Sequence, residues 1–554
     1  MATSDVSADI STTEEKTKEY TQSFLARIRS FHNDPLHSAA YLGNLARFLH
    51  KPNQKSARHA RRPNPQRFVP ESLAEEECRP FVYEYALFPD MDPKLTTFDD
   101  IDKYKQAISI NNHNADCNEL IFLAGRPSPE WLSAVGARYK LDHRFFHQHL
   151  NFLPTGQRDW FTAPTLPSRS HNVIRFCIPS ILFVGEHRYV NIVDLQKARG
   201  DCERRLLSCF RSFLEGTSTE AGQSIVRRIN IHSGDNLVIE QELSSCLLKR
   251  GDRWTVLVWT DSGQDNDFAF VPTPDTDRFK GAVNRFDFCP VFFEKDLSEK
   301  PHLSRPPTDA QNPRLRQALS SLPGNYGHTI DWTKAAVDPL SAIQEIFTFH
   351  AASELQYVNM LEQFATDQIS RAESNLAGTD MSSILHFDYA RSILIRHGAH
   401  IQNLLGSLDT CLKGWKHRAT QTHCCDEELM STLRVDLNYL STRIQNVITL
   451  CEAGRSAIMS NASIQEAKRS SEQAVLVTSL TKATNRLTFI FLPISFLTSV
   501  FGMNFRQLGQ GTLSIWLWVA IALPLLACCI VLVESGGHLK TILWRGLRCL
   551  SGQS

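Results

Sequence analysis

Two long runs without charge near the C-terminus constrain the fold of this chain more than any other feature. Leu487 to Phe505 are 19 residues without a charged side chain, and Gln507 to Val533 are 27 more, of which 513–533 are nearly all apolar. A bilayer core needs about 20 apolar residues in a helix. We therefore expect two transmembrane helices, 487–505 and 513–533. The alternative is a pair of buried core helices, which usually keep a polar face that these runs lack.

The distribution of Lys and Arg predicts how these helices are oriented. The flanks carry seven basic residues and the loop between the runs carries only Arg506. The seven are Lys468, Arg469, Lys482, Arg486, Lys540, Arg545 and Arg548. Because cytosolic flanks carry the excess of positive charge, we expect both termini in the cytosol and the short loop outside. The polar, acidic first twenty residues resemble neither a signal peptide nor a mitochondrial presequence, so we expect the plasma membrane, with an organelle membrane as the alternative.

The overall composition excludes several functional classes. Lys+Arg and Asp+Glu both number 59, which gives no indication of a nucleic-acid partner. The 14 cysteines include no CxxC pair, which fits structural thiols in a reducing compartment. The chain has no nucleophile elbow, P-loop or GxGxxG, so we expect neither an enzyme nor a tightly bound cofactor.

The rest of the chain divides into segments of different character. We expect a polar, mostly disordered tail over 1–77 and an α/β cytosolic domain over 78–335 that ends in a Pro-rich linker. We expect a stalk of long helices over 336–486 before the membrane hairpin and a short basic cytosolic tail over 534–554 after it. Within the α/β domain, Ser128 and Pro129 predict the start of a helix over 128–139. The predicted strands are 120–125, 172–178, 188–195, 228–232, 237–241 and 254–259.

Three long helices are predicted in the stalk. Asp338 and Pro339 open the first, and the second runs from about 382 to 415. The third begins near Asp426 and reaches the first apolar run, which makes 429–505 a helix of about 115 Å at ~1.5 Å per residue. Its apolar positions step by four and three, as in a coiled coil: Leu433, Leu437, Leu440, Ile444, Val447 and Cys451. We expect a helix this long to need partner chains.

A polar stripe on the first apolar run suggests an ion path. Two membrane helices enclose no lumen, so conduction would require an oligomer with one helix of each subunit at the axis. Hydroxyl residues recur at spacings of three and four on one helix face. The one larger gap, between Thr488 and Ser495, is filled on this face by Leu492. The stripe is Thr481, Thr484, Thr488, Leu492, Ser495 and Thr498. It would give a hydrated path with an apolar constriction. The alternative is that the hydroxyls bond to carbonyls one turn earlier and only aid packing.

The end of this run resembles a known family. In "FLPISFLTSVFGMNF" (491–505), Pro493, Ser495 and Phe501 precede the tripeptide Gly502, Met503 and Asn504. This spacing resembles the end of the first transmembrane helix of the CorA family of magnesium transporters. The long helix before it, the two spans and the basic tail agree, and "RPSPEWLSAVGARYKLDHRFFHQHL" (126–150) looks like the divergent fungal CorA-like proteins.

The resemblance implies a funnel-shaped homopentamer in a lipid bilayer, with the first spans around a pore. It implies transport of a divalent cation, Mg²⁺ first, that keeps much of its water. Mg²⁺ dehydrates reluctantly, so five Asn504 carbonyls suit the hydrated ion as a selectivity ring. Gly502 would let the backbone turn tightly out of the helix. Ser495 and Leu492 would face the pore further in.

The loop departs from the family pattern. Many CorA proteins carry an acidic residue after the tripeptide, whereas this loop contains Arg506 and no acid. A ring of arginines would repel divalent cations unless the side chains turn into the headgroups. Two alternatives therefore remain: a transporter of zinc or another divalent cation, similar to ZntB, or a non-conducting membrane scaffold or sensor that retains the fold.

Other groups of potential metal ligands are weaker candidates. His143, His147 and His149 include a pair four residues apart, but no third ligand is placed, which favours ordinary helix histidines. The segment 423–428, "HCCDEE", with His417 nearby, is a richer cluster at a predicted helix start. The acids of 261–268 and 90–102 could sense divalent ions between subunits, although solvated loops are the simpler interpretation.

Overall fold

The structure is a computed structural model that describes residues 2–31, 42–49, 80–89, 91–110, 117–150, 166, 172–184, 192–215, 222, 224–232, 236–251, 253–263, 286–291, 318–374, 381–418, 427–501 and 514–550. The chain forms two compact units, Met1–Arg455 and Ser456–Ser554. The first contains a mixed sheet with helices on both sides, and the second contains the end of one long helix and all of the last helix.

The first unit is built on an eight-stranded sheet in the order β2-β1-β3-β7-β6-β4-β8, with β5 paired to β6. The strands are β1 (Val82–Phe88), β2 (Met91–Phe98), β3 (Asn118–Ala124), β4 (Val173–Val184), β5 (Arg228–Ile231), β6 (Asn236–Arg250), β7 (Arg253–Thr260) and β8 (Phe286–Phe288). Among the described strands, β3 and β7 pair in parallel and the other pairs are antiparallel. The predicted α/β domain is thus present, with a mixed sheet.

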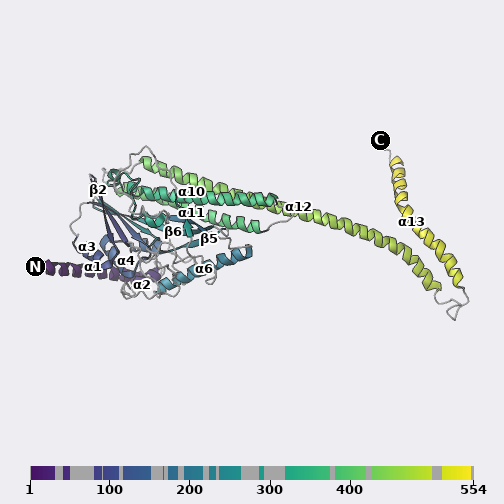
Figure 1. Ribbon diagram of the computed structural model, residues 1–554, viewed down its shortest axis with the longest axis horizontal. Coiled ribbons are helices and arrows are strands. Elements are labelled where there is room, and N and C mark those ends of the chain that lie inside the picture. Colours follow the sequence, from purple (N-terminus) through teal and green to yellow (C-terminus); the bar gives the residue numbers. More distant parts are fainter. Residues whose placement is uncertain are drawn as a thin grey trace. The chain divides into compact units, whose positions relative to one another are not determined.

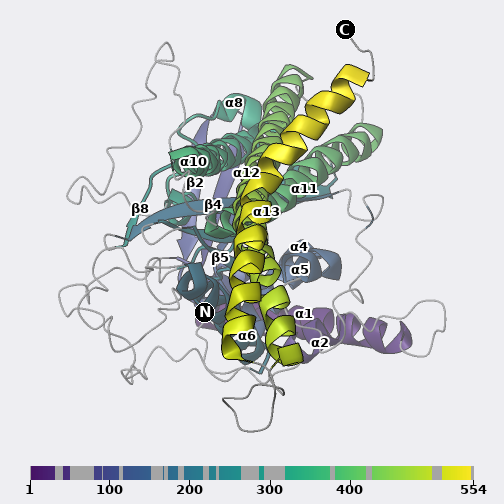
Figure 2. The same cartoon turned by 90° about the vertical axis from the view of Figure 1, so that its right-hand side faces the viewer.

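Helices cover both sides of this sheet, as Figures 1 and 2 show. On one side lie α1 (Ala2–Phe31), α2 (Gly43–Leu49), α3 (Ile101–Ile110), α4 (Pro129–Tyr139), α5 (His143–His149) and α6 (Ile192–Glu215). On the other lie α10 (Gln344–Ser374) and α11 (Met381–Arg418). The start of α4 is as predicted: Ser128 is the N-cap, its side chain accepts a hydrogen bond from Trp131 N, and Pro129 follows in the first turn.

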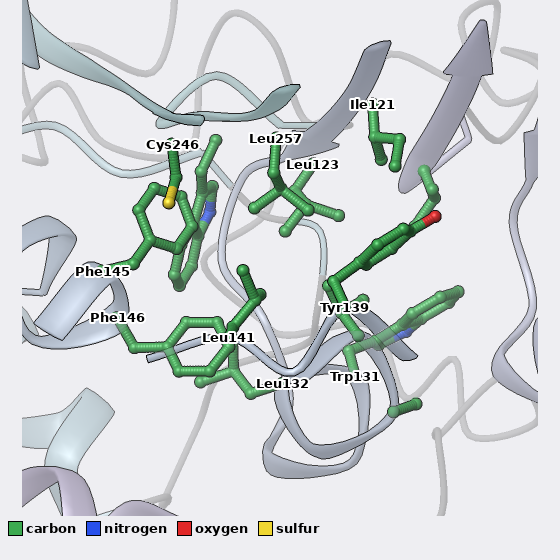
Figure 3. Packing of buried hydrophobic residues seen from close by; sticks show 14 of the residues in the cluster. Ile121, Leu123, Trp131, Leu132, Tyr139, Leu141, Phe145, Phe146, Cys246 and Leu257 are labelled. Carbon is green, nitrogen blue, oxygen red and sulfur yellow. The ribbon is translucent and has the colours of Figure 1, made fainter. Parts of the chain in front are cut away.

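The core between the sheet and α4 and α5 is rich in aromatic side chains. Figure 3 shows its centre, formed by Ile121, Leu123, Trp131, Leu132, Tyr139, Leu141, Phe145, Phe146, Cys246 and Leu257. Phe24 of α1 and Leu45 of α2 belong to the same cluster. This burial fixes the position of the strands that carry the polar groups described below.

The expectation that residues 1–77 are mostly disordered is wrong for two segments of this tail. Ala2–Phe31 form α1, which contacts α3 and α4, and Gly43–Leu49 form α2. The Tyr20 hydroxyl donates to the carbonyl of Leu141 at 2.8 Å, and Phe24 is buried. The polar composition concealed one apolar stripe that docks on the folded domain. Residues 50–79 lie outside the described residues.

The predicted strand 188–195 is wrong from Ile192 onward, because α6 begins there. Its buried residues recur at helical spacing: Leu195, Ala198, Cys202, Leu206 and Phe210. The β-branched residues at the start of α6 favour a strand when they are considered without this longer helical period. The predicted strands at 172–178 and 237–241 are correct but are parts of the longer strands β4 and β6.

Short helices connect the sheet to the stalk: α7 (Ala318–Ser321), α8 (Trp332–Ala335) and α9 (Pro339–Ala342). Asp338 caps α9, as predicted, but the long helix begins only after Ile343, at Gln344. The second predicted helix corresponds to α11. The third is α12 (Glu427–Phe501), with 75 residues in one helix, close to the predicted 429–505.

The heptad seam of α12 is buried within the same chain. Leu433, Leu437, Leu440, Ile444, Val447 and Cys451 are each at most 5% exposed. Ion pairs join α12 to its neighbours, Arg443 to Glu362 of α10 and Arg434 to Asp409 of α11. Helices α10 and α11 of the same chain thus pack on this seam, and the expectation that a helix this long needs partner chains stays a prediction for the rest of α12. Exposed apolar side chains lie on α12 both beside the seam, at Val435 and Tyr439, and after it, at Met459, Ile464, Val475 and Leu480.

Candidate functional site

The apolar end of α12 is the first part of the candidate transport site. No charged residue follows Arg486 in this helix, and α12 is long and apolar enough to cross a membrane. Its most apolar window is not buried inside the chain at all. A core helix of a soluble protein would be mostly buried, so this exposure favours a lipid or partner-helix environment.

The polar stripe lies on this exposed segment. Thr481, Thr484, Thr488, Leu492, Ser495 and Thr498 are all exposed, and Leu492 is 65% exposed. The structure therefore leaves the stripe free of contacts within the chain that would bury it.

Hydroxyl groups of the stripe hydrogen-bond to their own helix. Thr481 donates to the carbonyl of Val477 at 2.8 Å, Thr488 to that of Thr484 at 2.9 Å, and Thr498 to that of Ile494 at 2.8 Å. This is the bonding pattern of the packing alternative. Each hydroxyl oxygen that donates in this way still keeps lone pairs with which it can accept a hydrogen bond.

Pro493 lies inside α12, next to Leu492 of the stripe. Proline has no N–H, so the carbonyl of Phe489 lacks its usual partner one turn later. Prolines inside helices commonly produce a bend at this point. The irregularity therefore coincides with the position of the predicted apolar constriction.

The tripeptide itself lies outside the described residues. The described part of α12 ends at Phe501, so the structure does not place Gly502, Met503, Asn504 or Arg506. Their predicted roles stay predictions.

The second predicted span falls within α13 (Ile515–Leu550). Its apolar described part, Ile515–Val531, is shorter than the first candidate span, and Leu513 lies outside the described residues. At ~1.5 Å per residue these 17 residues cover about 25 Å, at the lower end of what spans a bilayer. One candidate span is thus established by length and composition among the described residues.

Among the described residues, no group of three potential metal ligands includes the histidines of α5. Burial lowers the pKa of His147 to about 4, and His143 lies 3.1 Å from Asp142. His149 is fully buried; its Nδ1 lies 2.9 Å from Ser244 Oγ, and its Nε2 lies 3.1 Å from Asp261 Oδ1. The interpretation as ordinary helix histidines fits this placement.

The acidic segments differ from the expectation of solvated loops. Asp261 is fully buried and accepts hydrogen bonds from Arg227 and from the backbone N–H of Glu242. Asp265 and Asp267 lie outside the described residues. Residues 91–98 form β2, and Asp100 caps α3 through the N–H of Asp102. Of the 423–428 cluster, 423–426 lie outside the described residues, as does the side chain of His417.

A polar cluster that the sequence did not reveal lies between β4, β6 and α11. Potential metal ligands of Cys177, Glu240 and His397 lie within 4.8 Å of one another, and among the described residues no other such group of three occurs. Burial lowers the pKa of His397, but the carboxylates of Glu354 and Glu240 outweigh burial and raise it to about 10. These residues stand far apart in the chain, and no spacing in the sequence connects them.

Comparison with known proteins adds to this geometry. Residues 356–533 match the model of a protein family described as "CorA-like Mg2+ transporter protein". The matched region begins in α10 and ends in the apolar part of α13, so it contains α11, α12 and the tripeptide. A search of curated proteins found no match.

Proposed function

Since residues 356–533 of this chain belong to the CorA-like Mg²⁺ transporter family, we propose that the protein is a channel or transporter for divalent cations, Mg²⁺ first. One observation carries the proposal. The exposed, charge-free end of α12 lies inside the matched region and leads directly into Gly502, Met503 and Asn504.

The ion path would form only in an oligomer, which we propose to be a homopentamer in a lipid bilayer. A single α12 encloses no space, so five copies would meet at an axis with the stripe inward. Hydroxyls that donate to their own helix would accept hydrogen bonds from water around the passing ion. The ring of Leu492 would then form an apolar constriction in an otherwise hydrated path. Ile515–Val531 would supply an outer second span that completes the hairpin, with both termini in the cytosol.

Asn504 would provide the selectivity ring. Mg²⁺ keeps several waters when proteins bind it, so a ring of amide carbonyls suits the hydrated ion better than the bare ion. Gly502 would allow the tight turn that brings these amides to the mouth of the path. No resident cofactor is required in this scheme, because the cation is cargo.

Arg506 supports a second candidate function. A positive ring two residues beyond Asn504, in a loop without acids, would oppose entry of divalent cations. The alternative is a relative with other selectivity, such as zinc, or a non-conducting scaffold or sensor.

Flux of Mg²⁺ into proteoliposomes tests the proposal. We expect the wild type to conduct and Asn504→Ala to reduce the flux by about tenfold or more, equivalent to ~1.4 kcal/mol. Asn461→Ala, a change at an exposed asparagine of α12 before the apolar segment, is the matched control and should conduct normally. Unchanged flux in Asn504→Ala would refute the filter.

The variant Arg506→Glu separates the two candidates. If the arginine ring only slows a working pore, this change raises divalent flux. If the protein is a scaffold, neither the wild type nor Arg506→Glu conducts any divalent cation.

A further inference from the structure

Three side chains with different donor atoms converge in the first unit, Met1–Arg455. The thiol of Cys177 comes from β4, the carboxylate of Glu240 from β6 and the imidazole of His397 from α11. Their donor atoms all lie within 4.8 Å of one another. Glu240 and His397 are 2% and 1% exposed, so no bulk water separates these groups.

The ring of His397 is held in the orientation of a metal ligand. Its Nδ1 lies 2.9 Å from both carboxylate oxygens of Glu354, a fully buried residue of α10. Its Nε2 points to the opposite side, where it lies 3.2 Å from Glu240 Oε1. Metal-binding histidines commonly donate the N–H of one ring nitrogen to a carboxylate, which fixes the other nitrogen toward the metal.

We propose that Cys177, Glu240 and His397 bind one transition-metal ion of the Zn²⁺ class, with Glu354 as the residue that positions His397. A thiolate, an imidazole and a carboxylate are all Zn²⁺ ligands, at bond lengths of about 2.0–2.3 Å. Tetrahedral ligation at these lengths places donors about 3.5 Å apart, so donors within 4.8 Å need only a small contraction around the ion. Mg²⁺ prefers six oxygen ligands, and a soft thiolate does not select it.

The two oxygens of the Glu240 carboxylate have different neighbours. Its Oε1 already accepts from Asn230 and lies against Arg396 and His397. Its Oε2 has a longer ion pair, with Arg228 Nε at 4.0 Å. This second oxygen is the one that the proposal assigns to the metal.

A metal-free ion-pair cluster is the competing account of the same geometry. In that account the charges are balanced by ion pairs among Glu354, His397, Glu240 and Arg396. The thiol of Cys177 then has no role in the cluster. The two accounts differ in whether the thiol matters, so the experiment centres on Cys177. The proposal does not depend on transport and can hold or fail independently of it.

The test uses the purified full-length protein in detergent, titrated with Zn²⁺ and, in parallel, with Co²⁺. We expect one tight site per chain and a Co²⁺ spectrum with a thiolate charge-transfer band and tetrahedral ligand-field bands. Cys177→Ser should remove the charge-transfer band and weaken Zn²⁺ binding at least tenfold. Glu354→Gln should weaken it by about 10–100-fold. Excess Mg²⁺ should not displace the ion.

Cys202→Ser is the matched control, because Cys202 is a buried cysteine of α6 outside the cluster. It should leave both the spectrum and the affinity unchanged. Thermal unfolding of each variant without metal shows whether it folds, and Cys177→Ala provides a second variant if the serine is poorly tolerated. Absence of a tight site in the wild type, or the same affinity in Cys177→Ser, would overturn the proposal.

Discussion

The ring of Phe387 on α11 occupies the space beside the backbone of Gly454 on α12. A Cβ on residue 454 would lie 2.8 Å from Phe387 Cζ and 3.0 Å from Ile369 Cγ1 of α10. Three helices thus meet where α12 has no side chain. In the sequence this glycine only interrupts a long helical pattern, and the structure gives it a packing role.

Substitution of this glycine should therefore destabilise the bundle. Glycine to alanine inside a helix normally stabilises by about 0.5–1 kcal/mol. For Gly454→Ala we expect the opposite sign, a loss of about 1–3 kcal/mol from overpacking. Gly406→Ala in α11 is the control, because a Cβ there meets no atom within 4 Å. Thermal unfolding should show a lower Tm for the first variant and an equal or higher Tm for the second.

The buried ion pair of Arg227 and Asp261 predicts a large loss of stability when one partner is neutralised. Arg227 Nε lies 2.6 Å from Asp261 Oδ2, and Arg227 Nη2 lies 3.0 Å from Asp261 Oδ1. Asp261→Asn removes the nearer of two carboxylates beside a buried guanidinium and leaves Glu242 Oε2 at 3.4 Å from Arg227 Nη1. We therefore expect a cost of up to about 3–5 kcal/mol. Asp99→Asn breaks the exposed pair with Lys103 and should cost less than about 1 kcal/mol. An equal loss of unfolding free energy in Asp261→Asn and Asp99→Asn, measured with denaturant, would contradict the stronger stabilisation by the buried ion pair.

His232 predicts a loss of stability in acid. Burial lowers its pKa from 6.5 to about 3, while its Nε2 lies 2.8 Å from the Tyr357 hydroxyl. Between these two values the unfolded chain binds the proton and the folded chain does not. Stability from this group is therefore complete above pH 6.5 and falls as the pH drops toward 3, by up to ~1.4 kcal/mol per pH unit. In His232→Gln, unfolding between pH 6.5 and 4.5 should depend less on pH than in the wild type; identical slopes would refute this.

The orientation predicted from basic residues can be measured at Leu508 of the loop. Leu508→Cys should react with a membrane-impermeant thiol reagent added from outside intact cells, because the loop is expected there. The wild type, with its native cysteines, is the control and should remain unlabelled. Reaction only after the cytosolic side is opened would reverse the assigned orientation.

Local patterns predicted much of the fold correctly. The cap at Ser128, the strands at 120–125 and 254–259 and the length of α12 all follow from residues close together in the chain. The first residues of α6 are predicted as a strand because a few β-branched side chains lie there. The helical spacing of the buried residues becomes visible only over about 20 residues. Likewise, the packing of α1 depends on contacts of Tyr20 and Phe24 with the surface around α4 and α5, which exists only in the folded domain.

The candidate sites also differ in whether local sequence or the tertiary fold determines them. The stripe on α12 could be predicted because a helix places residues three and four apart on one face, and those residues are exposed. Cys177, Glu240 and His397 could not, because a sheet register and a helix crossing bring them together across 220 residues. Of the groups considered from sequence spacing alone, the histidines of α5 take part in no group of three potential metal ligands among the described residues.

The most direct test of the central claim is whether a thiol reagent stops ion flux from a position on the stripe. In proteoliposomes, Ser495→Cys should conduct Mg²⁺ until a small hydrophilic thiol reagent is added, and the flux should then fall at least tenfold. Ile494→Cys, one residue away and turned by about 100° on the same helix, should keep its flux, as should the wild type. Flux that continues after the cysteine at 495 is fully modified would contradict a path lined by α12.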